Sequence, residues 1–440
     1  MWSDESIIWW AKANPTGTTL YTVPPSFVKR GNLKPNTLRH HNAQQKHHDR
    51  QIRQITLVFA LYFKANKRDN RCMMNTKYIW QQKNWTTWDY DLTTLLPLLN
   101  QAHYQQGRLF GRLWDIGFEE LAQLGLQSLT HSIVKNSEIE GEWLNPQSVR
   151  SSLARRLGVE IGGLLPVDRA VEGIVEMTLD ATTNVDTPLT LERLFAWHAS
   201  LFPTGYSGIS KIHVAALRDD KQGTMQVISG NMGKPKIHFE APPAETLNIE
   251  MQRFLDWINW EEKGDPFIKV AIAHLWFLTL HPFEDGNGRI ARAIADFLLA
   301  KTEKNAPRFY SLSAQIQKVR SDYYEILENT QKGFTNITTW IAWFIQNTIE
   351  AMYAAQETLD QVLAKHRYWQ KWRKFDLNER QRKVLNRLLD DFEGNLTNKK
   401  YAALTKVSRD TALRDLTDLV AKNILRTSGG GRSLHYEIVP

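Results

Sequence analysis

Cysteine is almost absent from this chain, whose 440 residues include only Cys72. A single cysteine excludes an intrachain disulfide and predicts a reducing compartment. Long apolar runs are lacking as well. The longest one in the first part of the chain, residues 55–63, is too short to span a bilayer and lies too far from the N-terminus to be a signal peptide. We therefore expect a soluble, cytoplasmic protein with no membrane partner.

After residue 73 the chain has no excess of positive or negative charge. Residues 74–440 hold 43 basic and 43 acidic side chains, so the net charge of +8 belongs to residues 1–73, with 12 basic and 4 acidic side chains. This first segment shows no helix or strand periodicity. We interpret it as a disordered upstream extension and expect Met74 to be the natural start. The alternative is a basic arm for nucleic acid or a membrane.

Reactive groups are concentrated in residues 281–292, which read HPFEDGNGRIAR. Residues 270–280 before this run and 290–300 after it are nearly all apolar, which predicts two buried helices with the run in the loop between them. Free N–H groups at the start of the second helix attract anions. Gly286 and Gly288 have no Cβ, so a phosphate can approach their backbone closely.

The charged side chains of the run suit a magnesium nucleotide. Asp285 offers the kind of oxygen ligand that Mg²⁺ prefers. Arg289 and Arg292 lie three residues apart and share a helix face, an arrangement that suits a polyphosphate. His281 can accept a proton near neutral pH. His274 lies seven residues earlier, and we expect a hydrogen-bonded core histidine there rather than a metal ligand.

The run is similar to the motif of the Fic family, H-P-F-x-[DE]-G-N-G-R-x-x-R, at every defined position. The resemblance implies transfer of AMP from ATP to a Ser, Thr or Tyr hydroxyl of a target protein, with Mg²⁺ as cofactor. It implies that His281 is the general base, that Asp285 is the metal ligand and that Phe283 anchors the loop. It also implies that the phosphates are bound by an anion hole and an arginine pair, made of Gly286, Asn287, Gly288, Arg289 and Arg292.

A second element, residues 136–141 with the sequence NSEIEG, resembles the pattern [ST]-x-x-x-E-[GN] of self-inhibited Fic proteins. Glu140 and Gly141 match it, whereas Asn136 stands where the pattern has Ser or Thr. The resemblance implies that Glu140 pairs with Arg292 and takes the place of the γ-phosphate contact. The alternative is a solvated carboxylate at a helix end that Gly141 terminates.

Two further segments are assigned by the same resemblance. Residues 211–243 alternate β-branched residues with turn formers, which predicts a short hairpin. In the family a hairpin flap pairs with the target's backbone by strand addition. We place it at about residues 232–239, and its contact residues are Ile237, His238 and Phe239. Tyr323 and Tyr324 are assigned to ATP binding near the adenine, with core packing as the alternative.

The C-terminal segment reads as a separate unit. Helical patterns at residues 378–390, 397–404 and 409–419 precede a hairpin with a glycine turn, which predicts a winged-helix domain. Residues 373–440 contain 14 basic and 9 acidic side chains. Recognition helices of this class enter the major groove of DNA, but many winged helices bind proteins instead. Both roles stay open for the basic residues around the third helix and the wing, which are Lys406, Arg409, Arg414 and Arg432.

The fold class expected is mainly α: a Fic helical core with a small β-hairpin flap, followed by an α+β winged helix. The expected boundaries are residues 74–160 for a helical region with the inhibitory helix, 161–350 for the core, 351–375 for a helical linker and 376–440 for the winged helix.

The expected activity is that of a protein adenylyltransferase inhibited by Glu140. The alternatives are removal of AMP with Glu140 orienting a water, transfer of another phosphate-containing group, and a DNA-binding regulator whose core only senses nucleotide. The presence of His281 argues against mere sensing, because binding alone needs no base. The candidate partners are a target protein with a hydroxyl side chain, DNA through the winged helix, and a second copy of the chain in a homodimer.

Overall fold

The computed structural model describes residues 76–439 apart from 115, 161–164, 222, 231–234, 262, 305–307, 390, 391 and 393. The extension assigned to residues 1–73 and the start assigned to Met74 lie outside the described residues. The chain divides into two compact units, residues 1–355 and 356–440. Both are mainly helical, as the sequence predicts. Each helix among the described residues is too short or too polar to cross a bilayer.

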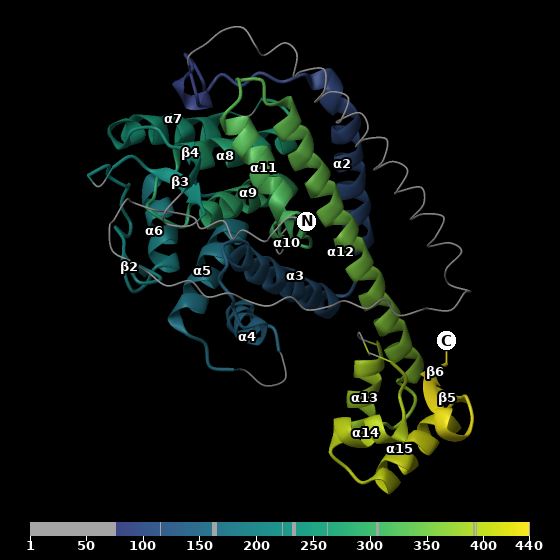
Figure 1. The fold of residues 1–440 in the computed structure, drawn as a ribbon. Coiled ribbons are helices and arrows are strands. Elements are labelled where there is room, and N and C mark those ends of the chain that lie inside the picture. The colour runs from purple at the N-terminus through teal and green to yellow at the C-terminus, as the bar shows by residue number, and fades with distance from the viewer. Residues whose placement is uncertain are drawn as a thin grey trace. The chain divides into compact units, whose positions relative to one another are not determined.

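Two buried helices flank the motif, as the apolar runs predict. Helix α8 (Pro266–Leu280) begins with Asp265, whose side chain accepts a hydrogen bond from the Phe267 N–H at 2.9 Å. Pro266 at the first helical position has the φ that a helix start needs. Helix α9 (Asn287–Glu303) follows the loop, and nearly all of its first fourteen residues are buried. The motif therefore lies inside the core, at the C-terminus of α8 and the N-terminus of α9 (Figure 1).

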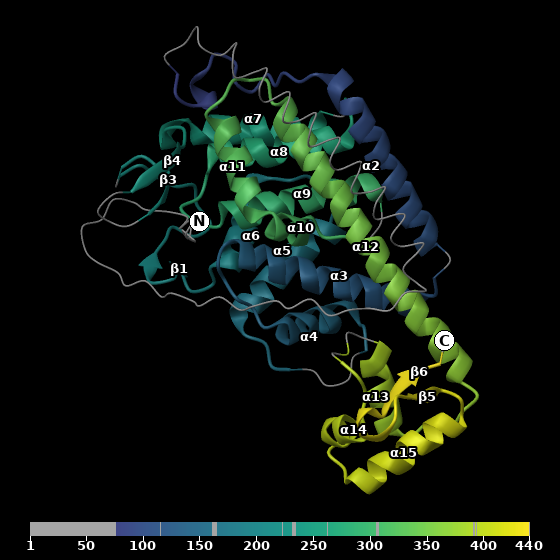
Figure 2. The same cartoon turned by 45° about the vertical axis from the view of Figure 1, so that its right-hand side comes forward.

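Helix α9 is the centre of the first unit, where it contacts five other helices. These are α8 and the four helices α3 (Phe118–Ile139), α5 (Arg169–Thr183), α6 (Leu191–Leu201) and α10 (Leu312–Lys318). Helix α3 ends beside the motif, which brings the predicted inhibitory segment to it. The outer layer contains α2 (Leu92–Leu113), α4 (Pro146–Leu157), α7 (Leu247–Trp260), α11 (Arg320–Gln331) and α12 (Thr338–Trp372) (Figure 2).

The strands of the first unit form two short antiparallel pairs. One pair, β1 (Tyr206–Ser207) with β2 (Ser210–Lys211), has only two residues in each strand. The other, β3 (Gln226–Ser229) with β4 (Lys236–Glu240), is the hairpin predicted from the β-branched residues. Val227 pairs with Phe239 and Ile228 with Ile237, so His238 is the extra residue of a β-bulge.

The hairpin β3–β4 is held by a small cluster of its own. The 3₁₀ turn η1 (Ile79–Gln81) lies against it, and the ring of Tyr78 meets that of Phe239 edge-on at 5.3 Å. The indole N–H of Trp80 donates to the carbonyl of Glu240 at 2.7 Å. A two-stranded hairpin is marginal alone, so these contacts are what keep it ordered.

The second unit contains three helices and a hairpin in the predicted order. They are α13 (Glu379–Leu389), α14 (Asn398–Thr405), α15 (Arg409–Ala421), β5 (Leu425–Ser428) and β6 (His435–Ile438), with the 3₁₀ turn η3 (Gly431–Ser433) between the strands. Helix α12 continues without a break through residue 351, so the predicted linker begins inside that helix. The basic residues Lys406, Arg409 and Arg414 are exposed, and the side chain of Arg432 lies outside the described residues.

Candidate functional site

The motif loop is fixed by backbone geometry that few residues adopt. Helix α8 ends at His281 with φ 48° and ψ 57°, a left-handed conformation that is uncommon outside glycine and is often found at functional sites. Gly286 has φ 81° and caps α9. The side chain of Asn287 closes the loop, because its amide group both accepts from the Phe283 N–H at 3.0 Å and donates to the Phe283 carbonyl at 2.8 Å. Phe283 itself is fully buried, so the loop is anchored as predicted for this side chain.

His281, the predicted base, is buried at the start of this loop. Its carbonyl accepts a hydrogen bond from the guanidinium of Arg218 at 2.8 Å, and the Arg218 N–H donates to the carbonyl of Pro282 at 2.9 Å. Burial, and then the charge of Arg218, lowers the pKa of His281 to about 3. The ring is therefore neutral at pH 7, which is the form that accepts a proton. The sequence did not single out Arg218.

Asp285, the predicted metal ligand, has a carboxylate held on both oxygens. The Gly286 N–H donates to Oδ1 at 2.6 Å, and the Ser207 hydroxyl donates to Oδ2. Burial raises the pKa of this carboxyl. The guanidinium of Arg289 lies 3.9 Å from Oδ2, and the side chain of Asp285 is 17% exposed. Each carboxylate oxygen has two acceptor sites, so a partly exposed carboxylate of this kind fits a hard ion such as Mg²⁺ that also binds phosphate oxygens.

The start of α9 has the features of an anion site. A Cβ built on Gly288 would lie 2.2 Å from Oε1 of Glu140, so the Glu140 carboxylate packs directly on this glycine. The Nε group of Arg289 and the Nη1 group of Arg292 are buried and have no hydrogen-bond partner among the described residues. Buried guanidinium donors normally have partners, so these two groups fit the oxygens of a phosphate chain.

The pair of Glu140 and Arg292 that the resemblance implied is present. Nη2 of Arg292 donates to Oε1 of Glu140 at 2.5 Å, and the carboxylate is 13% exposed. Gly141, with φ 81°, follows the last turn of α3 and ends this helix, as the alternative reading of the segment predicted. The alternative of a solvated Glu140 is wrong for this structure. Asn136 adds a further contact, because its side-chain carbonyl accepts from Nε of Arg292 at 2.5 Å.

A second carboxylate of the same segment contacts the other arginine. Nη1 of Arg289 donates to Oε2 of Glu142 at 2.6 Å. The left-handed Gly141 turns the chain, and the Glu142 N–H donates back to the carbonyl of Ser137 at 3.0 Å. This role of Glu142 was not predicted from the sequence. An acidic residue directly after the glycine that ends the inhibitory helix was the available signal.

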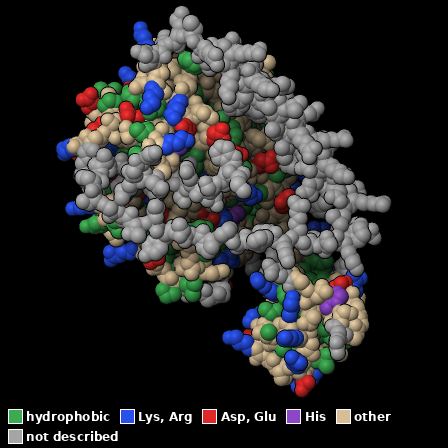
Figure 3. Space-filling model, in the orientation of Figure 1, with side chains coloured by type: hydrophobic (Ala, Val, Ile, Leu, Met, Phe, Trp, Pro, Cys, Tyr) green, Lys and Arg blue, Asp and Glu red, His purple; other side chains and the backbone are tan. Residues whose placement is uncertain are grey.

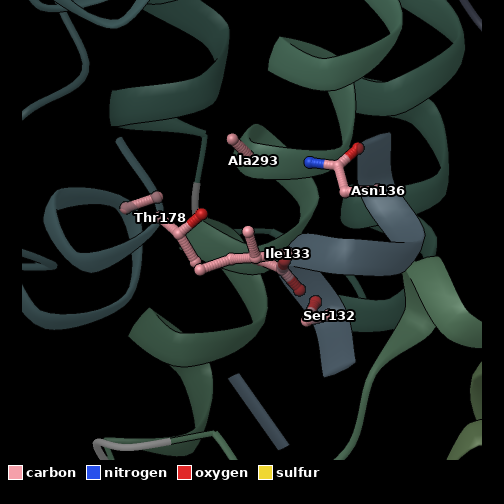
Figure 4. Close-up of a pocket in the computed structure, with 7 residues that line it drawn as sticks. Ser132, Ile133, Asn136, Thr178 and Ala293 are labelled. Carbon is pink, nitrogen blue, oxygen red and sulfur yellow. The ribbon is translucent and has the colours of Figure 1, made fainter. Parts of the chain in front are cut away.

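A narrow crevice borders Asn136 between helices α3, α5 and α9 (Figure 4). It leaves no room for a water-sized sphere, which excludes it as a ligand site. The narrow crevice shows instead that α3 packs closely against α9 at the point where Asn136 contacts Arg292. The lining residues are Ser132, Ile133, Asn136, Thr178, Ala181, Ala293 and Asp296.

Comparison with known proteins agrees with this geometry. Residues 188–299 match the model of the Fic/DOC family. This segment includes the motif loop and the first thirteen residues of α9. Residues 78–159, which include the segment of Glu140 and Glu142, match a domain of unknown function, DUF4172.

Three relatives illustrate the similarity. "Protein adenylyltransferase Fic" of Drosophila mojavensis is 26% identical over 246 residues, which are 54% of this chain and 43% of that protein. "Uridine 5'-monophosphate transferase" of Xanthomonas campestris is 32% identical over 122 residues, which are 26% of this chain and 21% of that protein. The solved structure of a Fic family protein from Desulfovibrio desulfuricans is 17% identical, with a TM-score of 0.46 over 78% of this chain and 96% of that one. The chain thus spans less than half the length of the curated relatives it matches.

Helix α11 carries the two predicted ATP-binding tyrosines. Tyr323 is buried, and its hydroxyl bonds Nε2 of His274 at 2.9 Å. Its ring packs against Trp340 and Trp343, which is the core packing that the sequence left as the alternative. Tyr324 is also buried, and its hydroxyl donates to the carbonyl of Ile139, at the end of α3, at 3.4 Å. A role of either ring beside the adenine stays a prediction.

His274 has the predicted character of a core histidine. It is fully buried, and Nδ1 lies 3.2 Å from the carbonyl of Ala291. A carbonyl can only accept, so Nδ1 carries the proton and Nε2 accepts from the Tyr323 hydroxyl. Burial lowers the pKa of His274 to about 3, and the charge of Arg292 adds to this effect.

The three predicted flap residues point in different directions. Ile237 is exposed and available to a partner. His238, the bulge residue, lies 2.5 Å from the Ser229 hydroxyl through Nε2 and 2.5 Å from a Glu328 oxygen through Nδ1. Phe239 is buried in the cluster behind the hairpin. The last two residues therefore fix the hairpin on α11 and η1, and the contact with a target stays a prediction.

Among the described residues, one further group has the composition of a metal site. His213, Asp219 and Glu284 have ligand atoms within 4.8 Å of one another. Glu284 already accepts two hydrogen bonds from His213, at 2.8 Å and 3.1 Å, and Asp219 pairs with Lys221 at 3.1 Å. These hydrogen bonds and this ion pair already explain why the three side chains lie close together.

Proposed function

We propose that this protein is a self-inhibited adenylyltransferase that transfers AMP from ATP to a Ser, Thr or Tyr hydroxyl of a target protein. The observation that carries the proposal is the buried loop of residues 281–292, with a neutral His281, a held carboxylate on Asp285 and two arginines with unpartnered N–H groups. The names of two relatives, an adenylyltransferase and a uridine monophosphate transferase, support transfer of a nucleoside monophosphate.

The chemistry follows from the placement of these groups. The target hydroxyl loses its proton to His281 while its oxygen attacks the α-phosphorus of ATP. The bond from the α-phosphorus to the bridging oxygen breaks, and pyrophosphate leaves. Asp285 would hold Mg²⁺, whose charge neutralises the phosphate oxygens. The backbone N–H groups at the start of α9 and the guanidiniums of Arg289 and Arg292 stabilise the charge that develops on the phosphates.

Self-inhibition follows from the two acidic side chains of the α3 segment. Glu140 occupies Arg292 and the space against Gly288, where a terminal phosphate would otherwise lie. Glu142 occupies Arg289. The competition is between carboxylate and phosphate for the same guanidiniums, and charge-assisted hydrogen bonds make both strong partners. One N–H of each arginine stays unpartnered, so a nucleotide can still enter with a misaligned phosphate chain.

The donor and the base are tested together. Full-length protein is incubated with ATP labelled at either the α- or the γ-phosphate, and with α-labelled UTP. The proposal predicts label from the α position of ATP alone. His281→Ala should reduce labelling by about 10²–10⁴-fold while ATP binding persists. Label from the γ position would indicate a kinase, and equal labelling by wild type and His281→Ala would refute the assignment of the base.

A further inference from the structure

His198 on α6 is a buried polar residue that the motif does not include. It is fully buried, and both of its ring nitrogens have partners. Nε2 lies 3.2 Å from the backbone carbonyl of Asp285, in the motif loop. Nδ1 lies 3.1 Å from the backbone nitrogen of Ala215. Because a buried polar group without a partner is costly, these two bonds define how the ring is held.

The partners of His198 determine its tautomer. The N–H of Ala215 can only donate, so Nδ1 must be the unprotonated acceptor. The carbonyl of Asp285 can only accept, so Nε2 must carry the proton and donate it. The ring therefore bridges two backbone groups, the N–H of Ala215 and the carbonyl of Asp285 in the motif loop.

The ring of His198 also contacts the anchor of the loop. It stacks on the ring of Phe283 with centroids 4.3 Å apart and planes 10° apart. Phe202, which caps the C-terminus of α6, contacts the His198 ring at 5.1 Å, and the guanidinium of Arg289 lies 4.9 Å from its ring. A Cβ on Gly286 would lie 2.9 Å from the Phe202 ring. The C-terminal end of α6 thus contacts the motif loop at Phe283, Asp285 and Gly286.

Ser207 completes this support from the strand β1. Its hydroxyl donates to Oδ2 of Asp285, while the carboxylate's other oxygen accepts from the Gly286 N–H. The short connection from α6 is tight, since the Gly205 N–H donates to the carbonyl of Phe202 at 3.0 Å. Residues 198–207 therefore contact both the backbone and the carboxylate of Asp285.

We infer that His198 and Ser207 are positioning residues for the metal-binding carboxylate of Asp285. His198, as the Nε2–H tautomer, fixes the backbone of Asp285, and Ser207 fixes the direction of the carboxylate. This inference rests on the proposed function, because it assigns a purpose to Asp285. Groups that hold a metal ligand typically change metal affinity by about 10–100-fold when they are removed.

The role of Ser207 is tested by metal-dependent nucleotide binding rather than by turnover. Full-length Glu140→Gly protein, in which the competing carboxylate is gone, is titrated with Mg²⁺ at fixed α,β-methylene-ATP by calorimetry. Ser207→Ala should raise the Mg²⁺ concentration for half-maximal binding by about tenfold or more, without changing metal-free nucleotide binding. Ser207→Thr keeps the hydroxyl and should restore the original value. Ser210→Ala, opposite Ser207 in the β1–β2 pair, is the matched control and should have no effect.

The role of His198 is tested by its protonation state. In full-length protein with ¹⁵N-labelled histidine, the signal lost in His198→Gln identifies the residue. The inference predicts a neutral ring with the proton on Nε2 at pH 7. A proton on Nδ1, or a charged ring, would overturn it. In the calorimetric experiment, His198→Gln keeps a donor near the position of Nε2 and should weaken Mg²⁺ binding less than His198→Ala.

The outcomes separate the inference from the proposed function. If the Glu140→Gly protein binds α,β-methylene-ATP equally with and without Mg²⁺, the metal role of Asp285 fails and the inference fails with it. If it binds with a metal dependence that Ser207→Ala leaves unchanged, the positioning role of Ser207 is wrong while the proposed function stands. If Ser207→Ala and Ser210→Ala weaken binding equally, the effect comes from a disturbed β1–β2 pair, and the inference is again refuted.

Discussion

Asn136 is the one position where the inhibitory segment departs from the family pattern, and its contacts explain why the departure is tolerated. An Asn side chain offers a carbonyl acceptor, and that oxygen bonds Nε of Arg292 at 2.5 Å. The backbone carbonyl of Asn136 accepts from the same guanidinium at 3.2 Å. The pair of Glu140 with Arg292 could be predicted from the sequence. The partner of Asn136 could not, because the direction of its side chain depends on how closely α3 packs on α9.

At the same scale, the buried histidines predict how stability depends on pH. The pKa of His274 is lowered from 6.5 to about 3, so the unfolded chain binds a proton between those values that the folded chain does not. Its contribution to stability is complete above pH 6.5 and is lost as the pH falls toward 3. At pH 5 the loss from this residue is about 2 kcal/mol, since one pKa unit corresponds to about 1.4 kcal/mol.

The matched variant is His274→Gln, which does not titrate. The free energies of unfolding of wild type and variant, measured with denaturant, should differ most at pH 7. That difference should shrink by about 2 kcal/mol by pH 5. A difference that is independent of pH would show that His274 is not neutral in the folded protein.

At the scale of elements, the long periodic segments could be predicted and the short ones could not. Helices α8 and α9 follow from apolar runs, and the β3–β4 hairpin follows from its β-branched residues. The two-residue strands β1 and β2 are too short to show a period, so Ser207 was missed. The bulge at His238 depends on its partners Ser229 and Glu328, and the latter lies far away in the sequence.

The two carboxylates at the end of α3, Glu140 and Glu142, are expected to inhibit labelling to different degrees. Glu142 is 45% exposed, whereas Glu140 is 13% exposed, so the bond of Glu142 to Arg289 is better screened by water. Glu142→Gln should raise target labelling by about two- to fivefold, corresponding to a partly exposed ion pair worth up to about 1 kcal/mol. Glu138→Gln is the control, because Glu138 lies on the same turn but pairs with Lys135 at 2.6 Å. Equal effects of the two variants would mean that only the net charge of the segment matters.

At the scale of the whole molecule, the second unit has a basic surface without an assigned partner. Figure 3 shows several Lys and Arg side chains on its visible face. Lys406, Arg409 and Arg414 are exposed around α15, the third helix of the unit. The winged-helix assignment stays a prediction, and both DNA and protein stay open as the partner of this surface.

DNA binding by the full-length chain should depend steeply on salt. Each phosphate contact contributes about 0.9 to the slope of log affinity against log salt, so Arg409→Ala with Arg414→Ala should reduce the slope by about two. Arg426→Ala removes a cation that is already paired with Glu437 at 3.0 Å and serves as the control. Absence of binding to any duplex at low salt, measured by fluorescence anisotropy, would instead favour a protein-docking role.

The central claim, that a competing carboxylate holds a competent Fic site inactive, is tested most directly by quantifying AMP adducts with intact-mass spectrometry. Glu140→Gly should raise the rate of adduct formation by about tenfold or more, since about 1.4 kcal/mol of lost competition corresponds to a factor of ten. Arg292→Ala should not mimic this gain, because it also removes a phosphate contact, and the double variant should resemble Arg292→Ala alone. A lower rate for Glu140→Gly than for wild type would contradict the account and would make Glu140 a participant in AMP removal or a structural residue.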